Sequence, residues 1–212
     1  MTAEPVPLPG DHPPIEGPRL RFRPVLESDL SDLRRWLADA EVRQFYGDPP
    51  ASEAAAREDY LQADVNPVWR FVIEEDGRGV GEIQYHHAYP GSDYAWSAGI
   101  DIFIGDPDAR DRGVGTEAIR TMLRFLFEEK RVHRATIDPE VANARAIRAY
   151  EKAGFRLDGV LRHNAFEHGE YVDTHFMSIL EDEWPAARER WDAERAGQPS
   201  VAPRTDRSRP AR

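Results

Sequence analysis

The alternation of apolar and polar positions divides the first half of the chain into short strands and helices. Residues 20–24 predict a strand, and apolar positions at helical spacing over residues 30–37 predict the helix that follows. A polar segment, residues 52–63, has a weaker helical pattern. Two runs rich in β-branched and aromatic residues, 68–73 and 80–87, flank a polar turn and predict a hairpin.

The second half of the chain continues with strands and helices in alternation. Residues 96–104 predict a strand with Ile100, Ile102 and Ile104 on one face, and residues 114–127 carry apolar side chains at helical spacing. The elements expected after these are a strand at 134–138, a helix at 143–153 ended by Gly154, strands at 155–161 and 171–180, and a helix at 181–195. This alternation predicts one α/β domain.

The two ends of the chain differ from this patterned middle. Residues 1–18 carry prolines at 5, 7, 9, 13, 14 and 18, which remove helix and ladder hydrogen bonds, so we expect a disordered leader. Residues 196–212 are rich in arginine, and we expect a disordered basic tail. The folded domain should span residues 19–195. The tail carries a charge of +3, so the remaining residues, 1–195, carry −14, which together give the total of −11.

Composition excludes several classes of function. The net charge of −11 over 212 residues argues against nucleic acid or an anionic membrane surface and favours a cationic partner. The chain has no cysteine, which excludes an acyl-cysteine intermediate and thiolate zinc sites. No run approaches the ~18 apolar residues that span a bilayer, so we expect a cytoplasmic protein. His86 and His87 are adjacent in a strand and point to opposite faces, so we interpret them as surface or pocket-rim residues and predict no metal site.

The segment Arg110-Asp111-Arg112-Gly113-Val114-Gly115, at the start of a predicted helix, carries the first chemical signal. A helix start exposes backbone N–H groups and the positive end of the helix dipole, so glycines there can admit a pyrophosphate, with Arg110 and Arg112 as further donors. The motif alone has a second explanation, because glycines before a helix also allow close packing of strand and helix. The residues that follow, Thr116-Glu117-Ala118, match neither a Walker loop nor a dinucleotide fingerprint.

A second motif lies in the next predicted helix, which carries Asn143, Ala146, Tyr150, Gly154 and Phe155. Together the two motifs resemble those of the GCN5-related N-acetyltransferases. The resemblance implies a mixed, mostly antiparallel sheet with helices on both faces, splayed at the strand that holds acetyl-CoA. It also implies acetyl-CoA as the cosubstrate and no metal.

The resemblance implies roles for particular residues. The pyrophosphate would lie on the glycine loop and the first helical turn, and the pantetheine arm would lie along the preceding strand. The loop residues are Arg110, Asp111, Arg112, Gly113, Val114, Gly115 and Thr116, and the strand residues are Ile102, Phe103 and Ile104. Asn143 is first a helix cap, and the resemblance adds a contact with the arm or the amine. Tyr150 is either a core aromatic or the group that meets the departing thiolate, and we favour the second role.

Asp101 breaks the pattern of its strand, since it lies between Ile100 and Ile102. A buried carboxylate is costly unless it has partners or faces a wet cleft. Asp101 is therefore either a structural aspartate tied to an arginine or to backbone N–H groups, or a base or anchor for a substrate ammonium.

Four segments narrow the resemblance to the aminoglycoside 6′-N-acetyltransferases. They are Gly99-Ile100-Asp101, residues 136–139, Ile83-Gln84-Tyr85 and Trp36. In that group the aspartate matching Asp101 is proposed as the base, and the aspartate matching Asp138 binds substrate amines. Gln84 and Trp96 complete the expected acceptor contacts, although the tryptophan-rich segment of the group is represented here only by Tyr94 and Trp96. Further acids considered for the pocket are Glu82, Asp93 and Glu140.

We therefore predict direct attack of a primary amine on the thioester in a ternary complex, with the 6′-amine of an aminoglycoside as the leading acceptor. Two other acceptors stay open: a protein N-terminus, as in the ribosomal-protein N-acetyltransferases, and a hydroxamate-siderophore precursor. A non-catalytic acyl-CoA sensor is the alternative of a different class. We expect a monomer or a homodimer, with no nucleic-acid or membrane partner.

Overall fold

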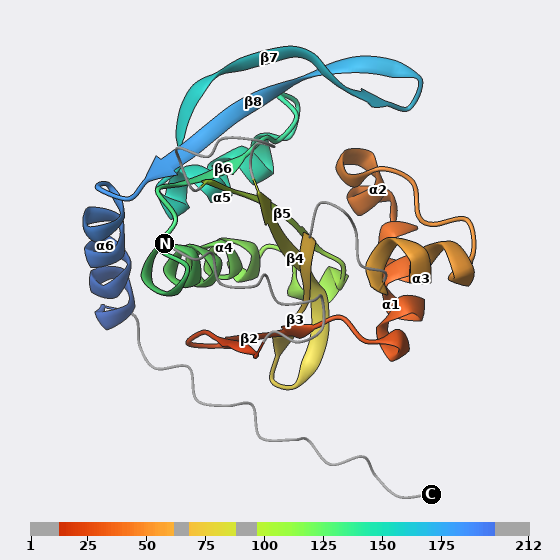
Figure 1. The fold of residues 1–212 in the computed structure, drawn as a ribbon, viewed down its shortest axis with the longest axis horizontal. Helices are drawn as coiled ribbons and strands as arrows, with labels where there is room; N and C mark the ends of the chain where they lie inside the picture. The colour runs from red at the N-terminus through yellow and green to blue at the C-terminus, as the bar shows by residue number, and fades with distance from the viewer. Residues whose placement is uncertain (1–12, 62–67, 88–96, 198–212) are drawn as a thin grey trace, which may run out of the picture.

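An eight-stranded sheet runs through the part of the chain that the computed structural model describes, residues 13–61, 68–87 and 97–197 (Figure 1). The strands are β1 (Ile15–Glu16), β2 (Leu20–Pro24), β3 (Val68–Glu75), β4 (Arg78–His87), β5 (Ser97–Ile104), β6 (Arg134–Ile137), β7 (Arg156–Glu167) and β8 (Glu170–Leu180). Their spatial order is β1-β2-β3-β4-β5-β6-β8-β7. Every neighbouring pair is antiparallel except β5 with β6, so the mixed, mostly antiparallel sheet is confirmed.

Helices cover both faces of this sheet, as expected. They are α1 (Leu30–Leu37), α2 (Ala40–Tyr46), α3 (Glu53–Leu61), α4 (Val114–Arg124), α5 (Ala144–Ala153) and α6 (Trp184–Ala196). Leu33 and Trp36 of α1 share one buried cluster with Phe103 of β5. Ile100 of β5 belongs to a second cluster on the other face, together with Ile119 of α4. The alternation of side chains along β5 therefore divides the core into two layers.

The sheet splays between β5 and β6. Their parallel pairing joins Ser97 to Arg134, Ala98 to Ala135 and Gly99 to Thr136, and it extends no further between these two described strands. β5 nevertheless continues to Ile104 and stays paired with β4 along its whole length. A cleft therefore opens on the β6 side of β5 beyond Gly99, at the strand where the family resemblance implied it.

Two elements differ from the sequence prediction. Ile15 and Glu16 were expected in the disordered leader, but they form β1, because Ile15 pairs with Phe22 and is buried. The prolines that flank this dipeptide do not interrupt its two ladder positions. Helix α2 was not predicted; Asp39 caps it by accepting a hydrogen bond from the Glu41 amide, and Gly47 ends it with a φ of 86°.

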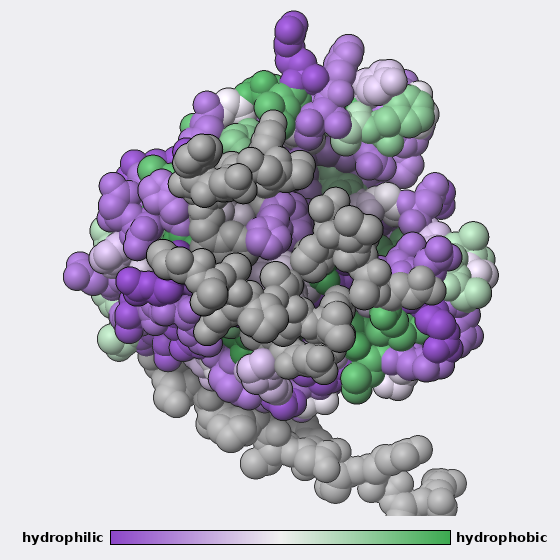
Figure 2. All heavy atoms as spheres, viewed as in Figure 1, coloured by the Kyte–Doolittle hydropathy of each residue, from purple (hydrophilic) through white to green (hydrophobic). Residues whose placement is uncertain are grey.

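The visible described surface is mainly hydrophilic (Figure 2). The large exposed apolar side chains lie mostly on the β7–β8 hairpin, at Leu157, Val160, Leu161, Phe166 and Tyr171. None of the described helices is both long enough and apolar enough to cross a membrane.

Candidate functional site

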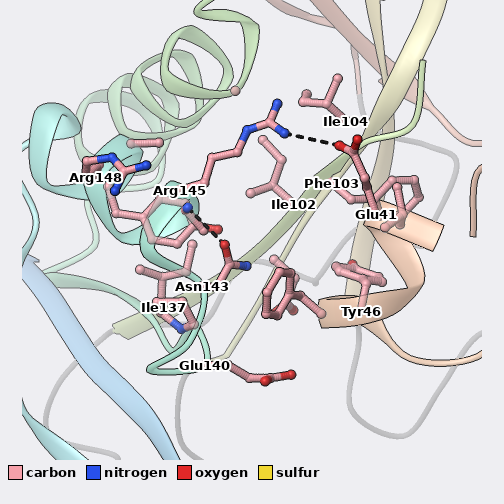
Figure 3. Close-up of a pocket in the computed structure, with 18 of the residues that line it drawn as sticks. Glu41, Tyr46, Ile102, Phe103, Ile104, Ile137, Glu140, Asn143, Arg145 and Arg148 are labelled. Atoms are coloured by element: carbon pink, nitrogen blue, oxygen red, sulfur yellow. Dashed lines mark hydrogen bonds and ion pairs between the residues drawn. The ribbon is translucent and has the colours of Figure 1, made fainter. Parts of the chain in front are cut away.

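A cavity of about 870 Å³ occupies the cleft beside β5. Its walls come from β5, the loop before α4, α5, α2 and the β7–β8 hairpin (Figure 3). Most of the residues expected in the site line it: Gln84, Asp101, Ile102, Phe103, Ile104, Arg110, Asp111, Gly113, Val114, Gly115, Thr116, Asp138, Asn143 and Tyr150. Arg112 is not among the lining residues, and Trp96, Tyr94 and Asp93 lie outside the described residues.

The N-terminus of α4 opens onto one end of the cavity. Gly113 precedes the helix in the left-handed conformation, with a φ of 79°, which glycine adopts without strain. The first hydrogen bond of the helix runs from the Glu117 amide to the Gly113 carbonyl at 3.0 Å. The amides of Val114, Gly115 and Thr116 therefore have no acceptor within the helix, and they can hold an anion such as a pyrophosphate.

The two arginines of the glycine loop do not extend freely toward this anion site. The Arg110 side chain is buried, and its guanidinium pairs with Asp39 at 2.9 Å and Glu41 at 3.2 Å. It also donates to the carbonyl of Ile104 at 3.0 Å, so it ties the loop to β5 and α2. Arg112 instead pairs with Glu75 at 3.0 Å, away from the cavity. Both arginines thus have protein partners in this structure, and the expectation that they donate to phosphate stays a prediction.

Three other cations line this end of the cavity: Arg145, Arg148 and Lys152 of α5. Figure 3 shows Arg145 and Arg148 on the α5 side and Glu41 on the α2 side. Arg145 lies 3.2 Å from Asp111 and 3.4 Å from Glu41. The sequence interpretation missed these cations, although their spacing of three and four residues puts them on one face of the helix.

Asn143 caps α5 at its N-terminus, and Tyr150 lies in its second half; both line the cavity. The Asn143 side chain accepts a hydrogen bond from the Ala146 amide at 3.1 Å, so its role as a helix cap is confirmed. Tyr150 is buried and lines the cavity. Burial raises the pKa of its hydroxyl, and the charges of Asp101 and Asp138 raise it further, so the group stays protonated at neutral pH and can donate a proton.

Asp101 lies at the other end of the cavity with two side-chain partners on β4. Gln84 donates to its carboxylate at 2.7 Å, and Nε2 of His86 lies 3.4 Å away. Burial alone would raise the pKa of Asp101, but the hydrogen bonds from His86 and Gln84 outweigh burial and lower it, so the carboxylate is ionised at neutral pH. The sequence interpretation placed His86 at the surface or the pocket rim and missed its contact with Asp101, although β-strand alternation puts it on the same face as Gln84.

Asp138 follows β6 and faces the same region. Asn164 of β7 donates to it at 3.3 Å. Burial raises the pKa of Asp138, and the charge of Asp101 raises it further. Glu140 and Glu167 also line this end, so carboxylates gather at the end of the cavity opposite the α4 N-terminus.

Glu82 was considered as a pocket acid, but it lies behind the cavity wall rather than in it. Its side chain is fully buried and accepts a hydrogen bond from the Tyr46 hydroxyl at 3.1 Å. Burial raises its pKa to about 8. Among the described residues, no group of three or more His, Asp or Glu side chains is arranged to hold a metal ion.

Comparisons with known proteins agree with this geometry. A family model for the acetyltransferase (GNAT) domain matches residues 19–156. Aminoglycoside N(6′)-acetyltransferase type 1 of Klebsiella pneumoniae is 30% identical over 154 residues, which cover 66% of this chain and 75% of that protein. Spermidine N(1)-acetyltransferase of Escherichia coli (strain K12) is 22% identical over 172 residues, covering 79% of this chain and 89% of the other. The crystal structure of an aminoglycoside acetyltransferase with coenzyme A and kanamycin aligns with a TM-score of 0.66 and 26% identity, over 80% of this chain and 98% of that one.

Proposed function

Because this chain belongs to the GNAT family and is an acetyl-CoA-dependent N-acetyltransferase, we propose that it acetylates the 6′-amine of an aminoglycoside. The observation that carries the proposal is the distribution of charge along the cavity. Cationic side chains and unpaired helix amides lie at one end, and Asp101, Asp138, Glu140 and Glu167 lie at the other. The first end suits a pyrophosphate and the second suits an acceptor with several ammonium groups.

The residues of the cleft suit the cosubstrate. We assign the amides of Val114, Gly115 and Thr116 to its pyrophosphate, and the backbone of residues 102–104 to its pantetheine arm, because that stretch of β5 lacks a β6 partner. When bound, acetyl-CoA supplies an acetyl group activated as a thioester. The chain has no cysteine, which excludes an acyl-cysteine intermediate, and we assign direct attack of the amine on the thioester in a ternary complex.

The roles we assign at the acceptor end follow from protonation. Asp101 is ionised, so it holds the substrate ammonium and takes up its proton. Asp138 provides the second carboxylate beside it. The Tyr150 hydroxyl keeps its proton at neutral pH, so we assign it as the group that donates a proton to the departing sulfur.

Spermidine is the second candidate acceptor. A relative acetylates it according to its name, and a row of carboxylates attracts any polyamine. The two acceptors differ in shape, since an aminoglycoside presents rigid rings and spermidine a thin flexible chain.

Thiol release from acetyl-CoA tests the acceptor. We expect turnover with kanamycin and neamine at a kcat/KM at least about tenfold above that with spermidine or with a peptide beginning in serine or alanine. The product should carry the acetyl group on the 6′-nitrogen by NMR. In the same assay Asp101→Asn should lose turnover by roughly 10²-fold or more while keeping acetyl-CoA binding. Turnover with spermidine or the peptide alone would contradict the proposal, and acetyl-CoA binding without any turnover would indicate a sensor.

A further inference from the structure

The His86 ring lies in a space that exists only because residue 99 is a glycine. His86 pairs with Gly99 across β4 and β5, and a Cβ built on Gly99 would lie 2.3 Å from Cε1 and 2.6 Å from Nε2 of the ring. Any other residue at position 99 would displace the imidazole. The ring therefore lies flat against β5, with Nε2 3.4 Å from the Asp101 carboxylate two residues further along that strand.

Both nitrogens of this ring face groups that can only accept hydrogen bonds. Nδ1 lies 3.0 Å from the backbone carbonyl oxygen of His87, and Nε2 faces the carboxylate of Asp101. A neutral imidazole carries one N–H, so it can satisfy only one of the two acceptors. Both acceptors are satisfied only when the ring carries both protons, so the ionised Asp101 favours the imidazolium. In agreement, the hydrogen bond to Asp101 raises the pKa of His86.

The titratable groups around His86 lie on β4, on β5 and after β6. Asp101 of β5 and Asp138 after β6 favour the imidazolium form of His86. His87, its neighbour on β4, interacts with His86 as a second titratable imidazole. On β3 the residue paired with His86 is Val68, and Arg70 acts on Asp101. An ammonium that binds Asp101 therefore meets a cation already in place on the same carboxylate.

We propose that His86 is a positioning residue that exchanges a proton with the acceptor through Asp101. This inference rests on the proposed function. The incoming ammonium replaces the imidazolium beside Asp101, and His86 releases its Nε2 proton to water. The freed Nε2 lone pair then faces Asp101, while Nδ1–H stays bonded to the His87 carbonyl and fixes the tautomer. His86 is then ready to receive the proton that the amine must lose.

The proton balance closes over one cycle. An N–H bond of the ammonium breaks as an O–H bond forms on Asp101, and this O–H bond breaks as the Nε2–H bond of His86 forms. The neutral amine attacks, its second proton goes to the departing sulfur, and His86 is an imidazolium again. One proton per turnover, the one released on acceptor binding, goes to solvent.

The test compares His86→Gln with His133→Gln. Glutamine can still donate an N–H toward Asp101 but cannot titrate, so it separates proton exchange from simple orientation. His133 is an exposed histidine that pairs with Glu181 and does not line the cavity, so it serves as the matched control. We expect His86→Gln to lower kcat by roughly 10²-fold and to remove the pH dependence of acceptor binding that follows the titration of His86, with His133→Gln close to wild type.

Proton release gives a second readout. Calorimetry with kanamycin at about pH 6.5, in two buffers of different ionisation enthalpy, should detect close to one proton released by the wild type and none by His86→Gln. Gly99→Ala, which displaces the ring without changing its chemistry, should reproduce the loss. Acetyl-CoA binding of each variant reports that its fold is intact.

The outcomes separate the two proposals. If the wild type acetylates kanamycin and His86→Gln keeps the wild-type pH profile and proton release, the role of His86 is wrong and the proposed function stands. If the wild type neither binds nor acetylates kanamycin, the proposed function fails. In that case nitrogen NMR of the resting enzyme still tests the ion pair, since a neutral His86 ring at about pH 6 contradicts it.

Discussion

Two carboxylates on the same face of neighbouring strands show how local environment decides protonation. Asp101 has donors from Gln84 and His86, and its pKa is lowered. Glu82 accepts from Tyr46 alone among its described neighbours, its Oε1 atom has no hydrogen-bond partner among the described residues, and its pKa is raised to about 8. The first is an ionised acid open to the cavity, and the second is a neutral acid within the core.

Glu82 should make stability depend on pH. Its pKa is about 8 in the folded protein and 4.5 in the reference state, so between these values the unfolded chain loses this proton while the native state keeps it. The free energy of unfolding therefore falls as pH rises from about 4.5 to 8. Glu82→Gln stays neutral throughout, so we expect its free energy of unfolding relative to wild type to rise with pH, by an amount on the order of a few kcal/mol at about pH 8, and its melting temperature to rise accordingly.

Thermal unfolding of the wild type and Glu82→Gln at about pH 5 and pH 8 measures this effect. Glu129→Gln, on an exposed part of the same molecule, is the matched control and should change little at either pH. If Glu82→Gln changed the melting temperature relative to wild type by the same amount at both pH values, the Glu82 carboxyl would not titrate between them.

At the scale of elements, the glycine loop depends on one buried cation. Arg110 joins the loop to Asp39 at the cap of α2, to Glu41 in its first turn and to the end of β5. Arg112, two residues away, makes its ion pair with Glu75 at a half-exposed site. The same substitution at these two arginines therefore compares the loss of a buried ion pair with the loss of a half-exposed one.

We expect Arg110→Ala to lower the free energy of unfolding by about 2 kcal/mol, because it removes a buried guanidinium that pairs with Asp39 and donates to the carbonyls of Ile104 and Gly105. Arg112→Ala should cost less than about 1 kcal/mol. Chemical denaturation measures both values, and calorimetry should show weaker acetyl-CoA binding for Arg110→Ala than for Arg112→Ala. Equal losses for the two variants would contradict the anchoring role of Arg110.

Long periodic elements could be predicted from the sequence, whereas short or register-dependent features could not. The stripe of α4 and the alternation of β5 are local patterns, and both predictions are confirmed. Helix α2 has seven residues with a single buried one, Val42, too few for a periodic signal. The contact of His86 with Asp101 depends on the pairing of β4 with β5, which the order of residues alone does not specify.

At the scale of the whole molecule, the net charge of −11 conceals a local polarity. Arg145, Arg148 and Lys152 lie at the cosubstrate end of the cavity, and four carboxylates lie at the other end. Glu41 and Asp111 pair with Arg145 at the cosubstrate end, so Arg148, Lys152 and the α4 amides are the groups that attract an anion there, and the carboxylates at the other end attract a cation. This arrangement also keeps the anionic cosubstrate away from the acceptor end.

The polarity predicts a salt dependence that grows with acceptor charge. Raising sodium chloride from about 0.02 to 0.5 M should increase the KM for kanamycin several-fold, because screening weakens its contacts with the outer carboxylates, Glu140 and Glu167. Glu140→Gln should reduce this dependence, whereas Asp192→Asn on α6 should leave it unchanged. A KM for kanamycin that is independent of salt would contradict a role for these carboxylates in acceptor binding.

The short parallel ladder between β5 and β6 has a consequence for the lifetime of the protein. Only three residue pairs join these two described strands, so few backbone hydrogen bonds connect the β1–β5 part of the sheet with the β6–β8 part. A ligand that occupies the cleft binds the native state alone, and at a hundred times its dissociation constant it adds about 2.7 kcal/mol to the free energy of unfolding. We therefore expect saturating acetyl-CoA to slow the digestion of this protein by trypsin, so that the supply of cosubstrate would set the lifetime of the protein as well as its rate.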